Sequence, residues 1–141
     1  MTACNTLIAG CKETAIPESV VCIGDSAFHG CSGMESISIP EGVTQIGRSA
    51  FHGCTDLESV TIPESVAVIG KEVFARCDKL RAIHMLSKNP SNIAANGSAF
   101  HSILNSCTLY VPEGKEKDYR SHHVLGRFKT IVAEKRHMQS S

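Results

Sequence analysis

The chain has 141 residues, of which 42% are hydrophobic, and this suits a single domain with a core of its own. Its 14 Lys and Arg residues equal its 14 Asp and Glu residues, and a net charge of zero argues against a dedicated nucleic-acid binder. The sequence holds no apolar run of about 18 residues, so no transmembrane helix is predicted, and its first residues lack a signal-peptide pattern.

A 23-residue repeat organises most of the chain. Three full units span residues 16–84 and share Ile-Pro-Glu, Val, Ile-Gly, Phe, Cys and a final apolar strand in the same order. Within a unit, a short strand with one buried side is stopped by Pro, and one unit cannot bury that side alone. Stacked coils bury it between neighbours, so the repeat predicts a solenoid.

The remaining segments fit the same architecture, which predicts one domain over residues 1–133. Residues 1–15 are expected to form an N-terminal half-unit. Residues 85–112 form a degenerate unit, whose spacing indicates a three-residue insertion in the polar stretch 87–92. Residues 113–133 are predicted to cap the last coil, with a short helix anchored by Tyr119 and a cover made by Phe128, Ile131 and Val132. Residues 134–141 are predicted to be a polar tail.

Each full unit carries a glycine four residues before its phenylalanine. These are Gly24, Gly47 and Gly70, and Asn96 takes the same place in the degenerate unit. After glycine, asparagine is among the residues most tolerant of positive φ. The substitution therefore predicts a left-handed turn residue at this position.

The unit L-x-x-I-x-I-P-x-x-V-x-x-I-G-x-x-A-F-x-x-C resembles the BspA-like, or Treponema pallidum-type, leucine-rich repeat. The match is carried by Ile39-Pro40, Ile46-Gly47, Ala50-Phe51, Cys54, Leu57, Val60 and their equivalents. The closing stretch 109–114, with Tyr119 and residues 128–132, resembles the C-terminal cap of such proteins from gut bacteria. The resemblance implies a right-handed solenoid with short parallel strands on the concave face, turns and short helical or extended segments on the convex face, and a small α/β cap.

The resemblance also implies a bacterial surface or secreted protein that serves adhesion and protein binding, without catalysis or cofactor. We expect no binding of nucleic acid. We expect a host extracellular or cell-surface protein to bind at the outward positions of the concave strands. These are Glu35, Ser36, Ser38, Glu58, Ser59, Thr61, Arg81, His84, Thr108 and Tyr110. His84 and Tyr110 are the best anchor candidates, because aromatic side chains are favoured at binding hot spots.

Seven cysteines allow a different class of function, a thiol-dependent or metal-binding protein. Cys31, Cys54 and Cys77 recur at the repeat spacing and are predicted to be reduced core thiols. Cys107 aligns with the outward Arg81 and is expected to be accessible, as are Cys4 and Cys22.

His29 and His52 occupy equivalent positions and are weak metal candidates, since Ala75 interrupts their column before His101. Surface histidines without a metal are the favoured interpretation.

A third interpretation is also open, in which the chain is the terminal segment of a longer solenoid with no ligand of its own. Charge is uneven along the chain: residues 1–84 carry six basic against ten acidic side chains, and residues 85–141 carry eight against four.

Overall fold

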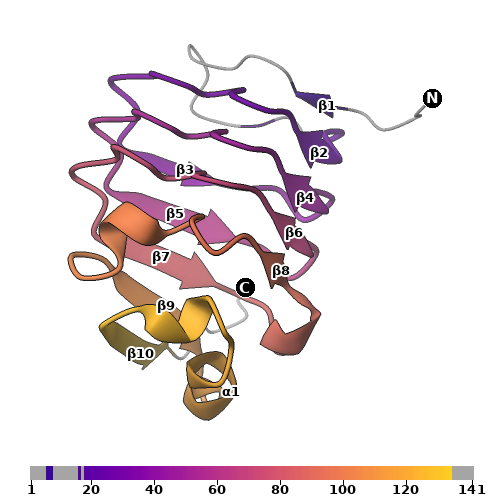
Figure 1. Cartoon of the computed structure of the whole chain (residues 1–141). Coiled ribbons are helices and arrows are strands. Elements are labelled where there is room, and N and C mark those ends of the chain that lie inside the picture. Colours follow the sequence, from indigo (N-terminus) through magenta and orange to yellow (C-terminus); the bar gives the residue numbers. More distant parts are fainter. Residues whose placement is uncertain (1–5, 8–15, 17, 135–141) are drawn as a thin grey trace.

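The computed structural model describes residues 6–7, 16 and 18–134 of the chain, which winds into a stack of coils with two parallel sheets (Figure 1). The large sheet has the order β10-β9-β7-β5-β3 and the small sheet the order β1-β2-β4-β6-β8. The large sheet consists of β3 (Ser36–Ser38), β5 (Ser59–Ile62), β7 (Ala82–Met85), β9 (Thr108–Pro112) and β10 (Thr130–Glu134). The small sheet consists of β1 (Thr6–Leu7), β2 (Cys22–Ile23), β4 (Gln45–Ile46), β6 (Val68–Ile69) and β8 (Ala94–Ala95).

Strand pairing follows the sequence repeat. Ser36 pairs with Ser59 and Ser59 with Ala82, each step being one 23-residue unit. Ala82 then pairs with Thr108, so the three additional residues lie between the two strands and leave the register intact. The predicted solenoid is confirmed. The extended segments expected on the convex side are themselves paired, as the small sheet.

A stack of phenylalanine rings runs through the core. Phe28, Phe51, Phe74 and Phe100 lie in consecutive coils, with centroids 5.0, 5.6 and 5.7 Å apart. Phe128 of the cap adds a tilted ring 5.3 Å from Phe100. All five rings are buried. Because each coil covers the ring of its neighbour, the apolar surface that one unit cannot bury is buried by stacking.

The prediction of left-handed backbone at Gly24, Gly47, Gly70 and Asn96 is wrong. Among the non-glycine residues that the structure describes, positive φ occurs two positions after the glycine, at Ser26, Ser49 and Glu72, and also at Arg76. The repeat needs glycine for another reason. A Cβ atom on Gly47 would lie 2.7 Å from the backbone nitrogen of Asp25, and one on Gly70 would lie 2.8 Å from that of Arg48.

The left-handed residues serve the bonding between coils. Ser26 N–H donates to Arg48 O at 2.8 Å, and Ser49 N–H donates to Lys71 O at 2.9 Å. The turn after the small sheet is thus hydrogen-bonded from coil to coil, as the strands are. Such pairing satisfies backbone groups that would otherwise be buried without a partner.

The cap binds to the inserted segment of the fourth coil. This segment contains the 3₁₀ turn η1 (Pro90–Asn92), and the cap begins with helix α1 (Glu116–Arg120). Tyr119 is fully buried, and its hydroxyl donates to Ser87 O at 2.5 Å, which confirms its predicted anchoring role. Burial raises the pKa of this phenol. The insertion therefore provides the acceptor on which the cap helix is fixed.

His122 makes the second link between cap and insertion. Its Nε2 lies 2.8 Å from Ile93 O, and its Nδ1 accepts hydrogen bonds from Val124 N–H at 3.0 Å and Leu125 N–H at 3.1 Å. Two further 3₁₀ turns, η2 (His101–Ile103) and η3 (Leu125–Arg127), complete the regular elements of the described chain. After η3 the chain forms β10, which pairs with β9 in parallel.

Candidate functional site

The outer face of the large sheet presents every residue of the predicted contact surface. The alternation in β3 exposes Ser36 and Ser38 and buries Ile37, and the later strands repeat this pattern. Glu35, Glu58 and Arg81 precede their strands and are exposed, while the remaining predicted positions are exposed or half-buried. The sheet therefore brings these side chains together on one surface, small and polar at β3 and larger toward β9.

Four side chains form a compact group at the C-terminal end of this face, which we call the C-terminal cluster: His84, Tyr110, Val132 and Glu134. The His84 and Tyr110 rings stack with centroids 4.7 Å apart and planes 12° apart. Glu134 Oε1 lies 2.9 Å from His84 Nδ1. Val132 pairs with Tyr110 across the sheet and is 40% exposed. The cluster thus joins an aromatic stack, a carboxylate and an exposed apolar side chain.

The geometry of the cluster suits recognition. The Glu134 carboxylate and the Tyr110 ring together restrict the His84 side chain, so little conformational entropy remains to be lost on binding. Aromatic side chains with a polar end are the residues that most often anchor protein interfaces. On β5 the neighbour of His84 is the smaller Thr61, so the stack of large rings ends at β7 and smaller side chains cover the rest of the face.

The sequence reasoning missed two members of this cluster. Glu134 was assigned to the polar tail, but it is the last residue of β10; the rest of that tail and most of the N-terminal half-unit lie outside the described residues. Val132 was expected to cover the core, but it faces outward. The alternation of residues 130–134 is typical of a strand, yet this strand follows the last repeat and has no equivalent from which its pairing could be predicted.

The cysteine predictions are partly wrong. Cys54 and Cys77 are buried free thiols, as predicted, and their sulfurs donate to Phe28 O at 3.1 Å and Phe51 O at 3.0 Å. Cys31, by contrast, is disulfide-bonded. Cys22 was expected to be accessible, but it is buried and disulfide-bonded as well. Cys4 lies outside the described residues.

Cys107 is buried, contrary to the expectation of an accessible thiol. The inward alternation of β9 extends back to this residue, whereas the aligned Arg81, directly before β7, is exposed. Burial raises the pKa of the Cys107 thiol from 9.0 to about 12. A buried, protonated thiol is a poor nucleophile, so the geometry gives no support to thiol chemistry at this position.

The two histidine metal candidates are stacked face to face. The His29 and His52 rings are 4.7 Å apart and within 2° of parallel. A metal ion binds in the plane of an imidazole, along a nitrogen lone pair, and lone pairs of parallel rings do not converge on one ion. Among the described residues, no group of three or more His, Cys, Asp or Glu side chains is placed to hold a metal.

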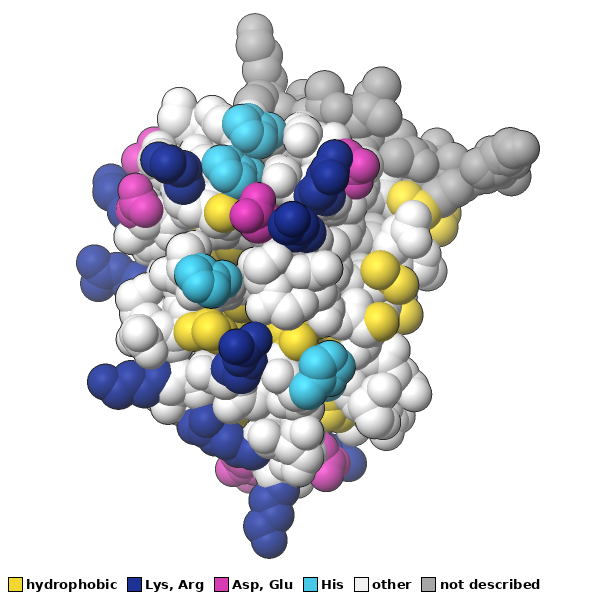
Figure 2. All heavy atoms as spheres, in the orientation of Figure 1, with side chains coloured by type: hydrophobic (Ala, Val, Ile, Leu, Met, Phe, Trp, Pro, Cys, Tyr) yellow, Lys and Arg dark blue, Asp and Glu magenta, His cyan; other side chains and the backbone are white. Residues whose placement is uncertain are grey.

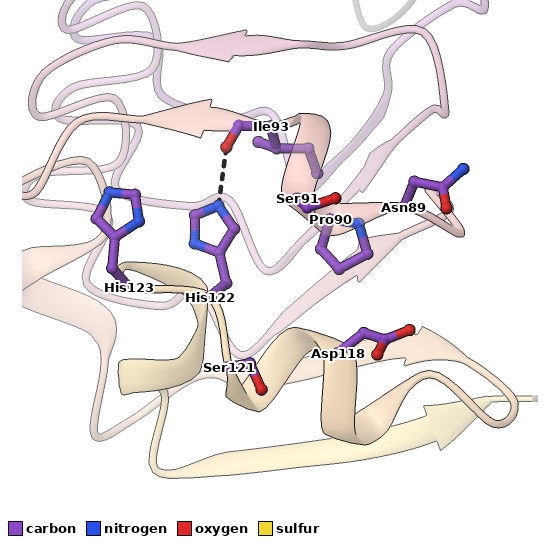
Figure 3. A pocket seen from close by; sticks show the side chains of 8 residues that line it. All are labelled: Asn89, Pro90, Ser91, Ile93, Asp118, Ser121, His122 and His123. Carbon is purple, nitrogen blue, oxygen red and sulfur yellow. Dashed lines mark hydrogen bonds between the residues drawn. The ribbon is translucent and has the colours of Figure 1, made fainter.

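A pocket of about 510 Å³ lies where the insertion meets the cap (Figure 3). Its lining comprises Asn89, Pro90, Ser91, Ile93, Asp118, Ser121, His122 and His123. Both ring nitrogens of His122 are already occupied by backbone groups, as the hydrogen bond to Ile93 in Figure 3 illustrates. The histidine at the back of this pocket therefore holds the cap in place and has no ring nitrogen left for acid–base chemistry.

Comparison with known families decides the relationship that the repeat suggested. The model of the BspA type leucine rich repeat region matches residues 7–117 in six copies. The chain belongs to this family. A search of curated proteins finds no significant match. Within the described residues, no helix is long and apolar enough to cross a membrane.

Two solved structures match this chain over most of its length. Pneumococcal vaccine antigen PcpA is 19% identical, with a TM-score of 0.50 over 94% of this chain and 45% of that one. A leucine rich cell surface protein from Faecalibacterium prausnitzii is also 19% identical, with a TM-score of 0.39 over 88% of this chain and 33% of that one. The chain thus spans less than half the length of either protein.

Proposed function

We propose that this chain is a non-enzymatic module that binds an extracellular protein through the outer face of its large sheet, as part of a bacterial surface or secreted protein. The C-terminal cluster carries the proposal, because it is the place on that face where aromatic, apolar and charged side chains are fixed together. Family membership supports the general class, since solenoids of stacked repeats use their extended surfaces for protein binding.

The disulfides support the location. Cys22 and Cys31 are both disulfide-bonded. Disulfides persist in oxidising surroundings such as the cell exterior and are rare in the cytosol. A secreted or surface-exposed module is the setting in which these bonds and the family resemblance agree.

The size of the face limits the affinity of a single module. Five strands at about 4.8 Å spacing span roughly 20 Å. A standard interface buries about 800 Å² on each partner, more than this face offers. We therefore expect weak binding by one copy and strong adhesion from several linked copies acting together.

The test compares two double variants in a pull-down of extracellular host proteins. His84→Ala with Tyr110→Ala removes the aromatic stack, and we expect recovery of the bound partner to fall at least about tenfold, or about 1.4 kcal/mol. Gln45→Ala with Val68→Ala changes exposed positions of the small sheet and should leave recovery unchanged. Equal recovery with the two double variants, both folded by circular dichroism, would show that the large-sheet face is not the contact surface.

A further inference from the structure

We propose that a hollow between the third and fourth coils binds the guanidinium group of an arginine side chain on a partner protein. The hollow has a volume of about 230 Å³ and is called here the Ala75 notch. Its lining comprises Glu72, Ala75, Ser98, His101 and Ser102. These residues lie in the turns that follow the small sheet, so the inference is independent of the C-terminal cluster on the large sheet.

The notch occupies the place of a missing ring. His29 and His52 stack at 4.7 Å in consecutive coils, and Ala75 takes the equivalent position in the third. His101 takes it in the fourth, because Phe74 and Phe100, the residues just before them, stack as neighbours. A methyl group therefore stands where the repeat would place an imidazole. Figure 2 shows histidine side chains on the face turned toward the viewer, some side by side and others apart.

The two coils are also less closely bonded at this point. Between the second and third coils, three turn N–H groups donate to carbonyl groups of the next turn at 2.8–3.0 Å; the donors are Ser49, Phe51 and Gly53. Among the described turn residues, one such bond joins the third coil to the fourth, from Phe74 N–H to Ala99 O at 3.4 Å. Gly97 O accepts a hydrogen bond from Arg127 of the cap instead. The two coils are therefore joined by fewer backbone hydrogen bonds at the hollow than the second and third coils are at the equivalent place.

The lining has the chemistry of a guanidinium site. Glu72 contributes a carboxylate, Ser98 and Ser102 contribute hydroxyl oxygens, and His101 contributes a ring, while no Lys or Arg belongs to the lining. Arginine carries five N–H donors in a planar cation that stacks on rings and pairs with carboxylates. Neighbouring rings of this column lie 4.7 Å apart, a distance at which a flat guanidinium can stack on a ring, whereas an ammonium group has no flat face to stack.

The volume indicates one side chain of a partner. Pockets for drug-sized molecules measure roughly 300–1,000 Å³, so the notch is smaller than that class. An arginine inserted here would complete the interrupted column from outside.

The experiment is an NMR titration of the whole chain with Nα-acetyl-L-arginine amide, and in parallel with Nα-acetyl-L-lysine amide. We expect saturable shifts at the notch residues with a dissociation constant on the order of 1 mM for the arginine compound. The lysine compound should bind at least about fivefold more weakly, because its point charge cannot stack. Absence of saturable shifts, or equal affinity for the two compounds, overturns the proposal.

Two variants locate the site. Ala75→His restores the ring of the repeat and fills the notch, so affinity for the arginine compound should fall at least about tenfold. The matched control, Ala67→His, places the same side chain at the exposed alanine directly before β6 and should not change affinity. Glu72→Gln should weaken arginine binding while leaving the fold intact. Unchanged affinity in the folded Ala75→His variant also overturns the proposal.

Discussion

The regular coils of residues 16–84 and the closing part of residues 85–134 are held together in different ways. In the regular coils, each type of contact recurs: rings stack on rings, thiols donate to carbonyl groups, and turn N–H groups bond to the next turn. In the closing part, single polar side chains make contacts that occur once, above all Tyr119 and His122. Repetition distributes stability over many similar contacts, whereas the cap depends on a few.

The difference predicts where the molecule is sensitive. A contact that recurs from coil to coil is supported by its neighbours, and loss of one copy leaves the others. A buried polar side chain with several backbone partners has no such support, because its removal leaves each partner unsatisfied. We therefore expect loss of such a side chain in the closing part to lower the free energy of unfolding more than loss of one recurrent contact in the regular coils.

Reactivity of Cys107 gives the largest expected difference. Burial raises the pKa of its thiol from 9.0 to about 12, which at pH 8 reduces the thiolate fraction roughly a thousandfold. We expect iodoacetamide to label Cys107 in the folded chain at least that much more slowly than in the chain unfolded in denaturant. Peptide mapping by mass spectrometry measures both rates. Labelling within about tenfold of the unfolded rate would contradict a closed fourth coil.

Removal of the His122 ring is expected to give the largest loss of stability. His122→Ala leaves Ile93 O and two backbone N–H groups without partners, at a cost of about 3 kcal/mol. Denaturant unfolding measures the loss, and faster labelling of Cys107 reports opening of the cap. His123→Ala removes the exposed ring that stacks on His122 but none of the His122 hydrogen bonds, so stability should fall by only about 1 kcal/mol. Similar effects of the two variants would refute the structural role of His122.

Close approach of the regular coils predicts the next effect. In Gly47→Ala the added methyl group meets the backbone of the preceding coil at 2.7–2.8 Å, so we expect a loss of about 2 kcal/mol. Gly42→Ala in the same unit is the control, since its nearest neighbour atom would lie 3.6 Å away. Thermal unfolding of both variants separates the two cases. An equal loss would mean that backbone proximity is not what the repeat glycine provides.

The smallest effect concerns a left-handed residue that is not glycine. Arg76 has φ of 61°, and the equivalent residues of the preceding coils, Gly30 and Gly53, have φ of 72° and 76°. Arg76→Gly removes a conformational cost of about 1–2 kcal/mol and adds the smaller entropic cost of glycine, for a net gain of roughly 0.5 kcal/mol. Gly53→Ala should act in the opposite direction. A lower melting temperature for Arg76→Gly would contradict this account.

Periodicity made the regular part of the fold predictable. Each of the three repeat units places the same residue type at the same position, so the inward orientation of Phe51 and Cys54 could be predicted from the agreement of the units. The repeat glycine was recognised as special but explained wrongly. Positive φ and close backbone approach both favour glycine, and a sequence does not distinguish the two causes. The contact with Asp25 of the preceding coil decides between them.

The closing part was less predictable because its features occur once. Tyr119 and Phe128 were assigned correctly as apolar anchors, but the acceptor for Tyr119 lies in an insertion that resembles a loop. The alignment of Cys107 with Arg81 was correct, yet the two side chains point differently because the strand alternation begins earlier in the fourth coil. The outward positions of the large sheet were predicted from the repeat, whereas Glu134 was missed because β10 belongs to no repeat.

Phe128 has a consequence for how such chains change in length. Its ring takes the place that the phenylalanine of a further coil would occupy, and the insertion that receives the cap lies in the coil directly before it. The fourth coil and the cap thus form one structural unit at the end of the solenoid. Coils can be gained or lost ahead of that ending in whole units of 23 residues without altering how the array is closed. Reach and copy number can vary in this way, while the surface at the end stays the same.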